Sequence, residues 1–64
     1  MNIDTLKKDD IVTIEYVKKT GEKTNRTIKI DDVKPNHIIG FDYLRNNYRS
    51  FLKTNITNIV NSNT

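Results

Sequence analysis

The chain has no cysteine, and this absence excludes disulfide bonds, thiol catalysis and Cys-based zinc sites. Its one histidine cannot build a His-rich metal site. Only two glycines are present, so there is no Gly-rich loop that could hold a phosphate. Ser50 has no plausible base or oxyanion loop to activate it. The sequence therefore predicts a protein that is not an enzyme and that uses no metal and no cofactor.

Long apolar runs are also lacking. No stretch of about 18 apolar residues occurs, so the sequence predicts no membrane-spanning segment. The first residues lack the basic stretch and apolar core of a secretory signal, and the resulting expectation is a cytoplasmic location.

The chain is too short for two domains. We expect one small domain over residues 1–64, with its core at about 11–60 and a frayed tail at 61–64. A core of this size gives marginal stability, which self-association would increase. Eleven Lys and Arg against eight Asp and Glu give a net charge of +3, which weakly favours an anionic partner. The abundance of Asn, Ile, Lys and Thr is typical of AT-rich genomes, such as those of low-GC bacteria and their phages.

Strand-like alternation dominates the first half of the chain. Residues 11–17 place Val12, Ile14 and Tyr16 on one side, which predicts a first strand. A turn over residues 18–23, which contains Gly21, leads to a second strand at residues 24–31. The pattern predicts a β-hairpin. Arg26 shares a face with the apolar residues of the second strand, and it is the unusual residue there.

The second half of the chain continues this pattern. Residues 32–36 are expected to form a connection, and residues 37–43 a third strand in which Gly40 marks a bend or bulge. A turn at residues 44–47 leads to a fourth strand at residues 48–53. Residues 55–60 fit either a short last strand or a single helical turn.

The N-terminal segment is mostly polar. Ile3 and Leu6 have the spacing of one helical turn, and residues 7–10 read as a turn into the first strand. With the strands above, the sequence predicts an all-β domain. We expect a small five-stranded SH3-like or Sm-like barrel that follows one short N-terminal helical turn.

Several short motifs occur between residues 11 and 59. They are an opening strand that ends in an aromatic, a Gly-centred hairpin, an Arg-bearing return strand, a Gly-aromatic-Asp string and an Arg-Ser-Phe strand. The residues are Val12 to Tyr16, Gly21-Glu22, Arg26-Thr27-Ile28, Gly40-Phe41-Asp42, Arg49-Ser50-Phe51 and Ile56. This set resembles the motifs of the WYL domain, a family of Sm-like barrels. The namesake Trp-Tyr-Leu tripeptide would fall at residues 36–38 and is absent, and Asn55 replaces the closing Arg.

The resemblance implies a binding module that senses a ligand or single-stranded nucleic acid through basic and aromatic side chains. WYL domains usually accompany a helix-turn-helix segment in bacterial regulators, for which this sequence has no room. Basic and aromatic residues gather at residues 43–51, where bases could stack on Tyr and phosphates could meet Arg. The complete set of predicted contact residues is Arg26, His37, Tyr43, Arg45, Tyr48, Arg49 and Lys53.

Structural roles for the same residues stay open. Tyr43 and Tyr48 are typical of strand ends, where the ring is partly buried and the hydroxyl is in water. Arg49 could pair with Asp42 across the hairpin, and His37 could be an ordinary surface residue.

The alternative function is interaction with a protein. Small domains encoded by phages or mobile elements dock on host polymerases, nucleases or defence proteins, and a net charge of only +3 fits this role. A homo-oligomer formed through edge strands is compatible with either function.

Overall fold

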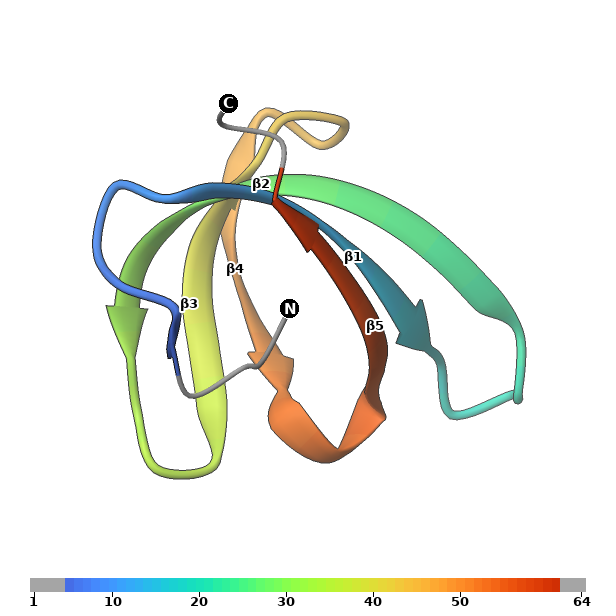
Figure 1. Ribbon diagram of the computed structural model, residues 1–64. Coiled ribbons are helices and arrows are strands. Elements are labelled where there is room, and N and C mark those ends of the chain that lie inside the picture. The colour runs from blue at the N-terminus through green and yellow to red at the C-terminus, as the bar shows by residue number, and fades with distance from the viewer. Residues whose placement is uncertain (1–4, 62–64) are drawn as a thin grey trace.

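The structure is a computed structural model that describes residues 5–61, with the Asn61 side chain outside the description. Within the described residues, β1 to β5 and the 3₁₀ helix η2 follow one another along the chain (Figure 1). They are β1 (Ile11–Val17), β2 (Lys23–Val33), β3 (His37–Asp42), β4 (Asn47–Leu52), the 3₁₀ helix η2 (Lys53–Asn55) and β5 (Ile56–Asn61). The strands form one antiparallel sheet in the order β4-β3-β2-β1-β5. The all-β prediction is confirmed.

The sheet is strongly curved. In a flat sheet the axes of β1 and β4, which are separated by two strands, would lie about 14 Å apart. Yet the rings of Tyr16 in β1 and Phe51 in β4 are in edge-to-face contact, with centroids 5.2 Å apart. Figure 1 shows how β2 arches over the molecule so that both edge strands turn toward the same interior. No ladder between β4 and β5 joins these edges, so the described sheet is open.

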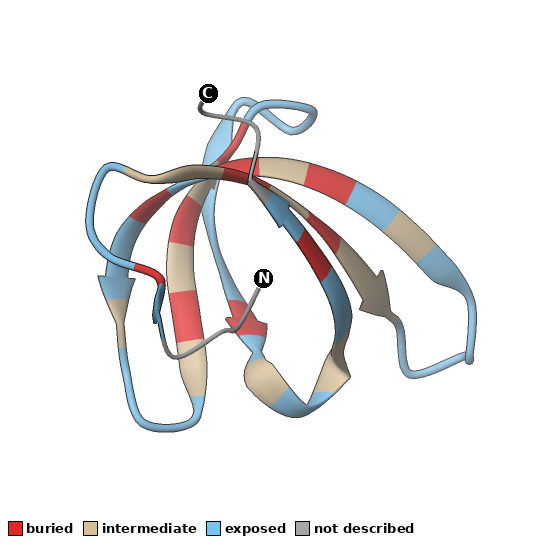
Figure 2. Cartoon of the chain, in the orientation of Figure 1, coloured by how far each residue is buried: buried red, intermediate tan, exposed pale blue. Residues whose placement is uncertain are grey.

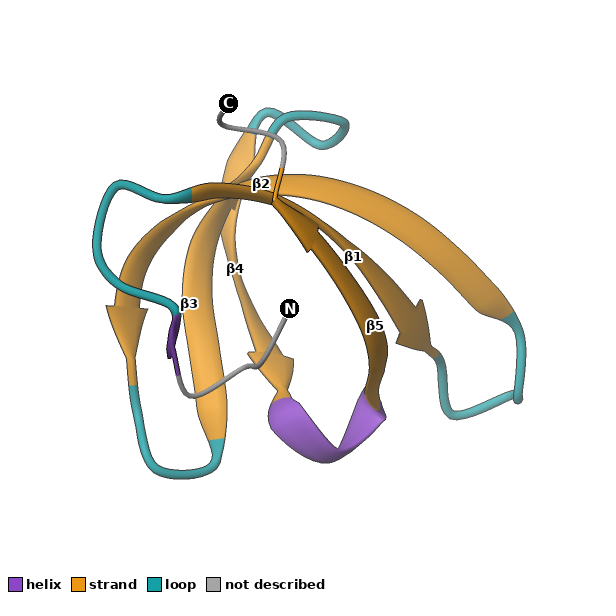
Figure 3. Ribbon diagram, viewed as in Figure 1, coloured by secondary structure: helices purple, strands orange, loops and turns teal. Residues whose placement is uncertain are grey.

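The three residues of η2 join the two edge strands. Fully extended, a connection of this length reaches only about 14 Å, whereas four strand spacings of a flat sheet measure about 19 Å. The short connection therefore requires the curvature. Of the two alternatives for residues 55–60, the strand is confirmed as β5, and the turn of 3₁₀ helix lies before it (Figure 3).

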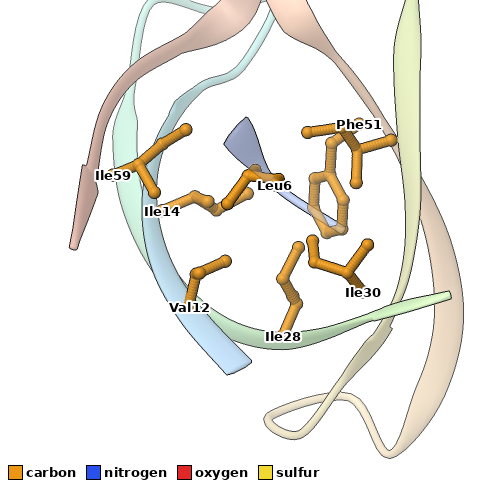
Figure 4. Close-up of a cluster of buried hydrophobic side chains, with 8 residues drawn as sticks. Leu6, Val12, Ile14, Ile28, Ile30, Phe51 and Ile59 are labelled. Carbon is orange, nitrogen blue, oxygen red and sulfur yellow. The ribbon is translucent and has the colours of Figure 1, made fainter. Parts of the chain in front are cut away.

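The concave side of the sheet holds the core (Figure 4). Alternation along β1 and β2 buries one face of each strand, as the sequence predicts. Leu6 reaches the core from the segment before β1, while Ile3, its predicted helical partner, lies outside the described residues. The buried apolar residues are Leu6, Val12, Ile14, Ile28, Ile30, Ile38, Phe51 and Ile59.

Gly40 allows β2 and β3 to approach closely. A Cβ atom at this position would lie 3.1 Å from both the Ile28 Cδ1 atom and the Lys29 carbonyl oxygen. A bulge does accompany Gly40, but it lies on the facing strand β2, where the register shifts between Ile30 and Asp32. β2 continues past this bulge to Val33, which shortens the predicted connection to residues 34–36.

The β3–β4 turn occupies residues 43–46, one position earlier than predicted. Two side-chain features explain the shift. Asp42 accepts hydrogen bonds from the backbone of the turn and so ends β3 one residue early. Asn46 takes the left-handed conformation with φ 54°, which allows β4 to begin at Asn47.

Candidate nucleic-acid interface

β4 is the most exposed strand of the sheet. Phe51 is its one buried residue, and the other five are exposed (Figure 2). An open depression of about 560 Å³ lies along this strand and is lined by Arg45, Asn47, Tyr48, Arg49 and Ser50. The depression brings together three of the seven predicted contact residues.

The two faces of β4 offer different chemistry. Arg49 is paired with Gly40 and shares its face with Phe51, which is the concave face of the sheet. Tyr48 and Ser50 lie on the convex face. Because the depression contains residues from both faces, it wraps around the free edge of β4. A cationic and an aromatic side chain therefore flank a single strand edge.

The free edge also exposes backbone groups. The Tyr48 N–H donates to the Asn47 side-chain oxygen at 2.8 Å, so it points away from β3. Alternation turns the N–H and C=O groups of Ser50 and Leu52 in the same direction. On the other edge of the sheet, the Asn58 side chain accepts the Ile59 N–H at 3.0 Å in the same way. An asparagine on each edge strand thus covers one backbone donor, which limits uncontrolled strand pairing.

Three aromatic rings cluster on the convex face beside this edge. The Phe41 ring contacts Tyr43 at a centroid distance of 5.4 Å and Tyr48 at 5.2 Å, both edge to face. Tyr43 is 47% exposed and Tyr48 is 61% exposed. Both tyrosines therefore keep much of their surface exposed while each packs against Phe41.

The charges of the chain are unevenly distributed along the sequence. All eight acidic residues lie at or before Asp42, whereas Arg45, Arg49 and Lys53 come after it. Since the first 42 residues hold as many cations as acids, the net charge of +3 belongs to the last part of the chain. Within residues 5–61, neither Arg45 nor Arg49 takes part in an ion pair. The sequence alone shows this uneven distribution of charge, although the net charge of the chain does not reveal it.

Arg26 is not part of this surface. It is 8% exposed, and its Nε lies 3.8 Å from Oδ2 of the fully buried Asp42. The pairing of Arg49 with Asp42 that the sequence left open is therefore wrong, because Gly40 is the register partner of Arg49. Residues 26 and 42 meet across β2 and β3 on the concave face, where Asp42 pairs with Ile28.

The remaining predicted residues lie at the opposite end of β4. His37 is half-buried at the start of β3 and pairs with Leu52. Lys53 begins η2, and its backbone N–H donates to the Asn36 carbonyl at 2.9 Å. The structure thus separates His37 and Lys53 from Arg45 by the length of β4, about 17 Å for five residue steps.

A second, smaller depression of about 90 Å³ places acidic residues next to the cationic surface. It lies beside Phe41 and Tyr48 and contains Asp9 and Asp31. Asp9 is 3.9 Å from the ammonium group of Lys29, so that lysine is already engaged. The surface along β4 is therefore more positive than the surface that continues across the sheet toward β2.

Residues 5–61 contain no group of three or more His, Asp or Glu side chains that could hold a metal ion. None of the helices in this range is long and apolar enough to span a membrane. A hydrogen bond from Lys34, and secondly its charge, lower the pKa of Asp32, but this exposed pair lies outside the β4 depression.

No family model, no curated protein and no solved structure matches the chain.

Proposed function

We propose that the chain is a non-enzymatic, WYL-like module that binds single-stranded nucleic acid along the free edge of β4. The observation that carries this proposal is the meeting of two exposed tyrosines and two arginines that make no ion pair within residues 5–61, at one strand edge. Stacking on aromatic rings together with contacts from cations to phosphates is the usual way in which proteins hold single strands.

Each residue then has a distinct role. Tyr48, and Tyr43 beside it, stack against bases on the convex face. Arg45 and Arg49 contact phosphates from the turn and from the concave side of the edge. His37 and Lys53 extend the contact at the far end of β4, and Arg26 supports the turn from inside the core.

We also propose that the curved sheet forms a small barrel. The strand order, the 3₁₀ connection between the edge strands and the strong curvature support an SH3-like or Sm-like barrel, in keeping with the WYL resemblance.

Salt dependence tests the proposed phosphate contacts. If Arg45, Arg49 and Lys53 each neutralise one phosphate, the logarithm of the binding constant should fall with the logarithm of salt concentration with a slope of about −2. Arg49→Ala should make this slope less negative by about 0.7. Tyr48→Ala should weaken binding by about 1–3 kcal/mol without changing the slope, because stacking is not ionic. The measurement is fluorescence anisotropy of a labelled oligothymidylate at several salt concentrations.

Lys19→Ala is the matched control, because it removes an exposed cation from the distant β1–β2 turn. This variant should bind like the wild-type protein. Equal affinities for wild type, Arg49→Ala and Tyr48→Ala, in variants that remain folded, would contradict the proposal.

A protein partner is the second candidate function. Apolar side chains are exposed at both ends of the β4 surface, with Leu44 at 70% and Leu52 at 48%, and the strand edge between them is free for pairing with another strand. Such a partner could be a host protein or a second copy of the chain. Binding through apolar contacts and backbone hydrogen bonds would depend only weakly on salt, which distinguishes it from phosphate binding.

A further inference from the structure

The core contains an ion pair that stability alone explains poorly. Asp42 is fully buried and Arg26 is 8% exposed. Their closest atoms are 3.8 Å apart, beyond hydrogen-bonding distance, and Asp42 Oδ2 has no hydrogen-bond partner in the described structure. Buried ion pairs are often no more stabilising than a well-packed apolar pair of similar volume. The arrangement therefore points to a role beyond core stability.

The other carboxylate oxygen holds the turn that carries Arg45. Asp42 Oδ1 accepts the Leu44 N–H at 3.0 Å and the Arg45 N–H at 3.4 Å. The Tyr43 N–H donates to the Thr27 carbonyl at 3.2 Å, which ties the same turn to the adjacent end of the sheet. The turn is therefore hydrogen-bonded both to the buried Asp42 side chain and to β2. Arg45 is one of the residues whose backbone is held in this way.

We propose that Asp42 is a positioning residue, which fixes the turn at residues 43–46 so that Arg45 faces the ligand, while Arg26 makes the buried carboxylate tolerable in the core. This inference rests on the proposed function, because it assigns Arg45 to ligand contact. A carboxylate binds backbone N–H groups more strongly than a neutral acceptor does. That strength requires a compensating charge in the core, since an isolated buried carboxylate is costly. Arg26, on the facing strand, supplies that charge.

Two double variants separate positioning from stability. Arg26→Met/Asp42→Leu removes both charges and also removes the acceptor for the turn. Arg26→Met/Asp42→Asn removes both charges but keeps a side-chain oxygen at the same place. Each variant is compared with the wild-type protein by thermal unfolding, by amide hydrogen exchange and by binding of a labelled oligothymidylate at low salt.

We expect the Leu variant to fold and to bind about tenfold more weakly, as weakly as Arg45→Ala, because one charge-assisted contact is lost. Adding Arg45→Ala to it should cause no further loss. The amides of Leu44 and Arg45 should exchange faster, whereas the Gly21 amide, which donates to Lys18 in the distant turn, should be unchanged. The Asn variant should recover most of the binding and of the amide protection.

The proposal is overturned if the folded Leu variant binds like the wild-type protein and keeps Leu44 and Arg45 protected. Hydrogen exchange of the wild-type protein is a further test that needs no variant. Unprotected Leu44 and Arg45 amides in that protein would overturn the proposal. If the wild-type protein does not bind the oligonucleotide, the proposed function fails separately. Amide exchange in the variants then still shows whether Asp42 holds the turn.

Discussion

Phe51→Ala is expected to reduce the free energy of unfolding by about 3–5 kcal/mol, the usual loss when a large aromatic is removed from a core. Phe51 is the one buried residue of β4, and its ring contacts Tyr16 of β1 across the concave side of the sheet. It therefore holds the exposed strand against the rest of the molecule. A domain of 64 residues has a total stability of roughly 3–10 kcal/mol, so this single change removes a large part of it.

Urea denaturation followed by circular dichroism measures this effect. Leu52→Ala is the matched control, because Leu52 is the next residue of the same strand and is 48% exposed. Its loss should be much smaller. Equal losses for the two variants would mean that β4 is not attached to the core through Phe51.

Asp42→Ala should be similarly destabilising, by about 3–5 kcal/mol, because it leaves the Arg26 charge buried without its partner. The turn amides of Leu44 and Arg45 lose their acceptor at the same time. We expect a large drop in the urea denaturation midpoint of this variant, measured by circular dichroism.

Adding Arg26→Met to Asp42→Ala should recover much of this stability, because the uncompensated charge is then removed. This recovery distinguishes a charge effect from a loss of packing. If Asp42→Ala is as stable as the wild-type protein, Arg26 and Asp42 are not a buried pair in solution.

Local patterns in the sequence are sufficient to predict most of the fold. The alternation in residues 11–17 and 24–31 identifies the first hairpin and its buried face, because each strand has one solvated face. Strand ends were predicted less well, since they depend on side chains that cap turns. Asp42 and Asn46 shift the β3–β4 turn by one residue through such local interactions.

The site could be predicted only in part. Composition identified the region rich in Arg and Tyr, and the structure gathers Arg45, Tyr48 and Arg49 in one depression. The partner of Asp42 could not be predicted, because it depends on the register between β2 and β3. Residue type alone groups His37 and Lys53 with the others, although β3 and β4 place them at the far end.

Amide chemical-shift changes during titration with oligothymidylate show whether nucleic acid binds at the β4 edge. We expect changes concentrated in residues 43–52, with the largest at Arg45, Tyr48 and Arg49, and only small changes in the β1–β2 turn at residues 18–22. The changes should diminish as salt is added. An unchanged spectrum at low salt, or changes centred on β1 and β5, would contradict the assignment of the β4 edge as a nucleic-acid interface.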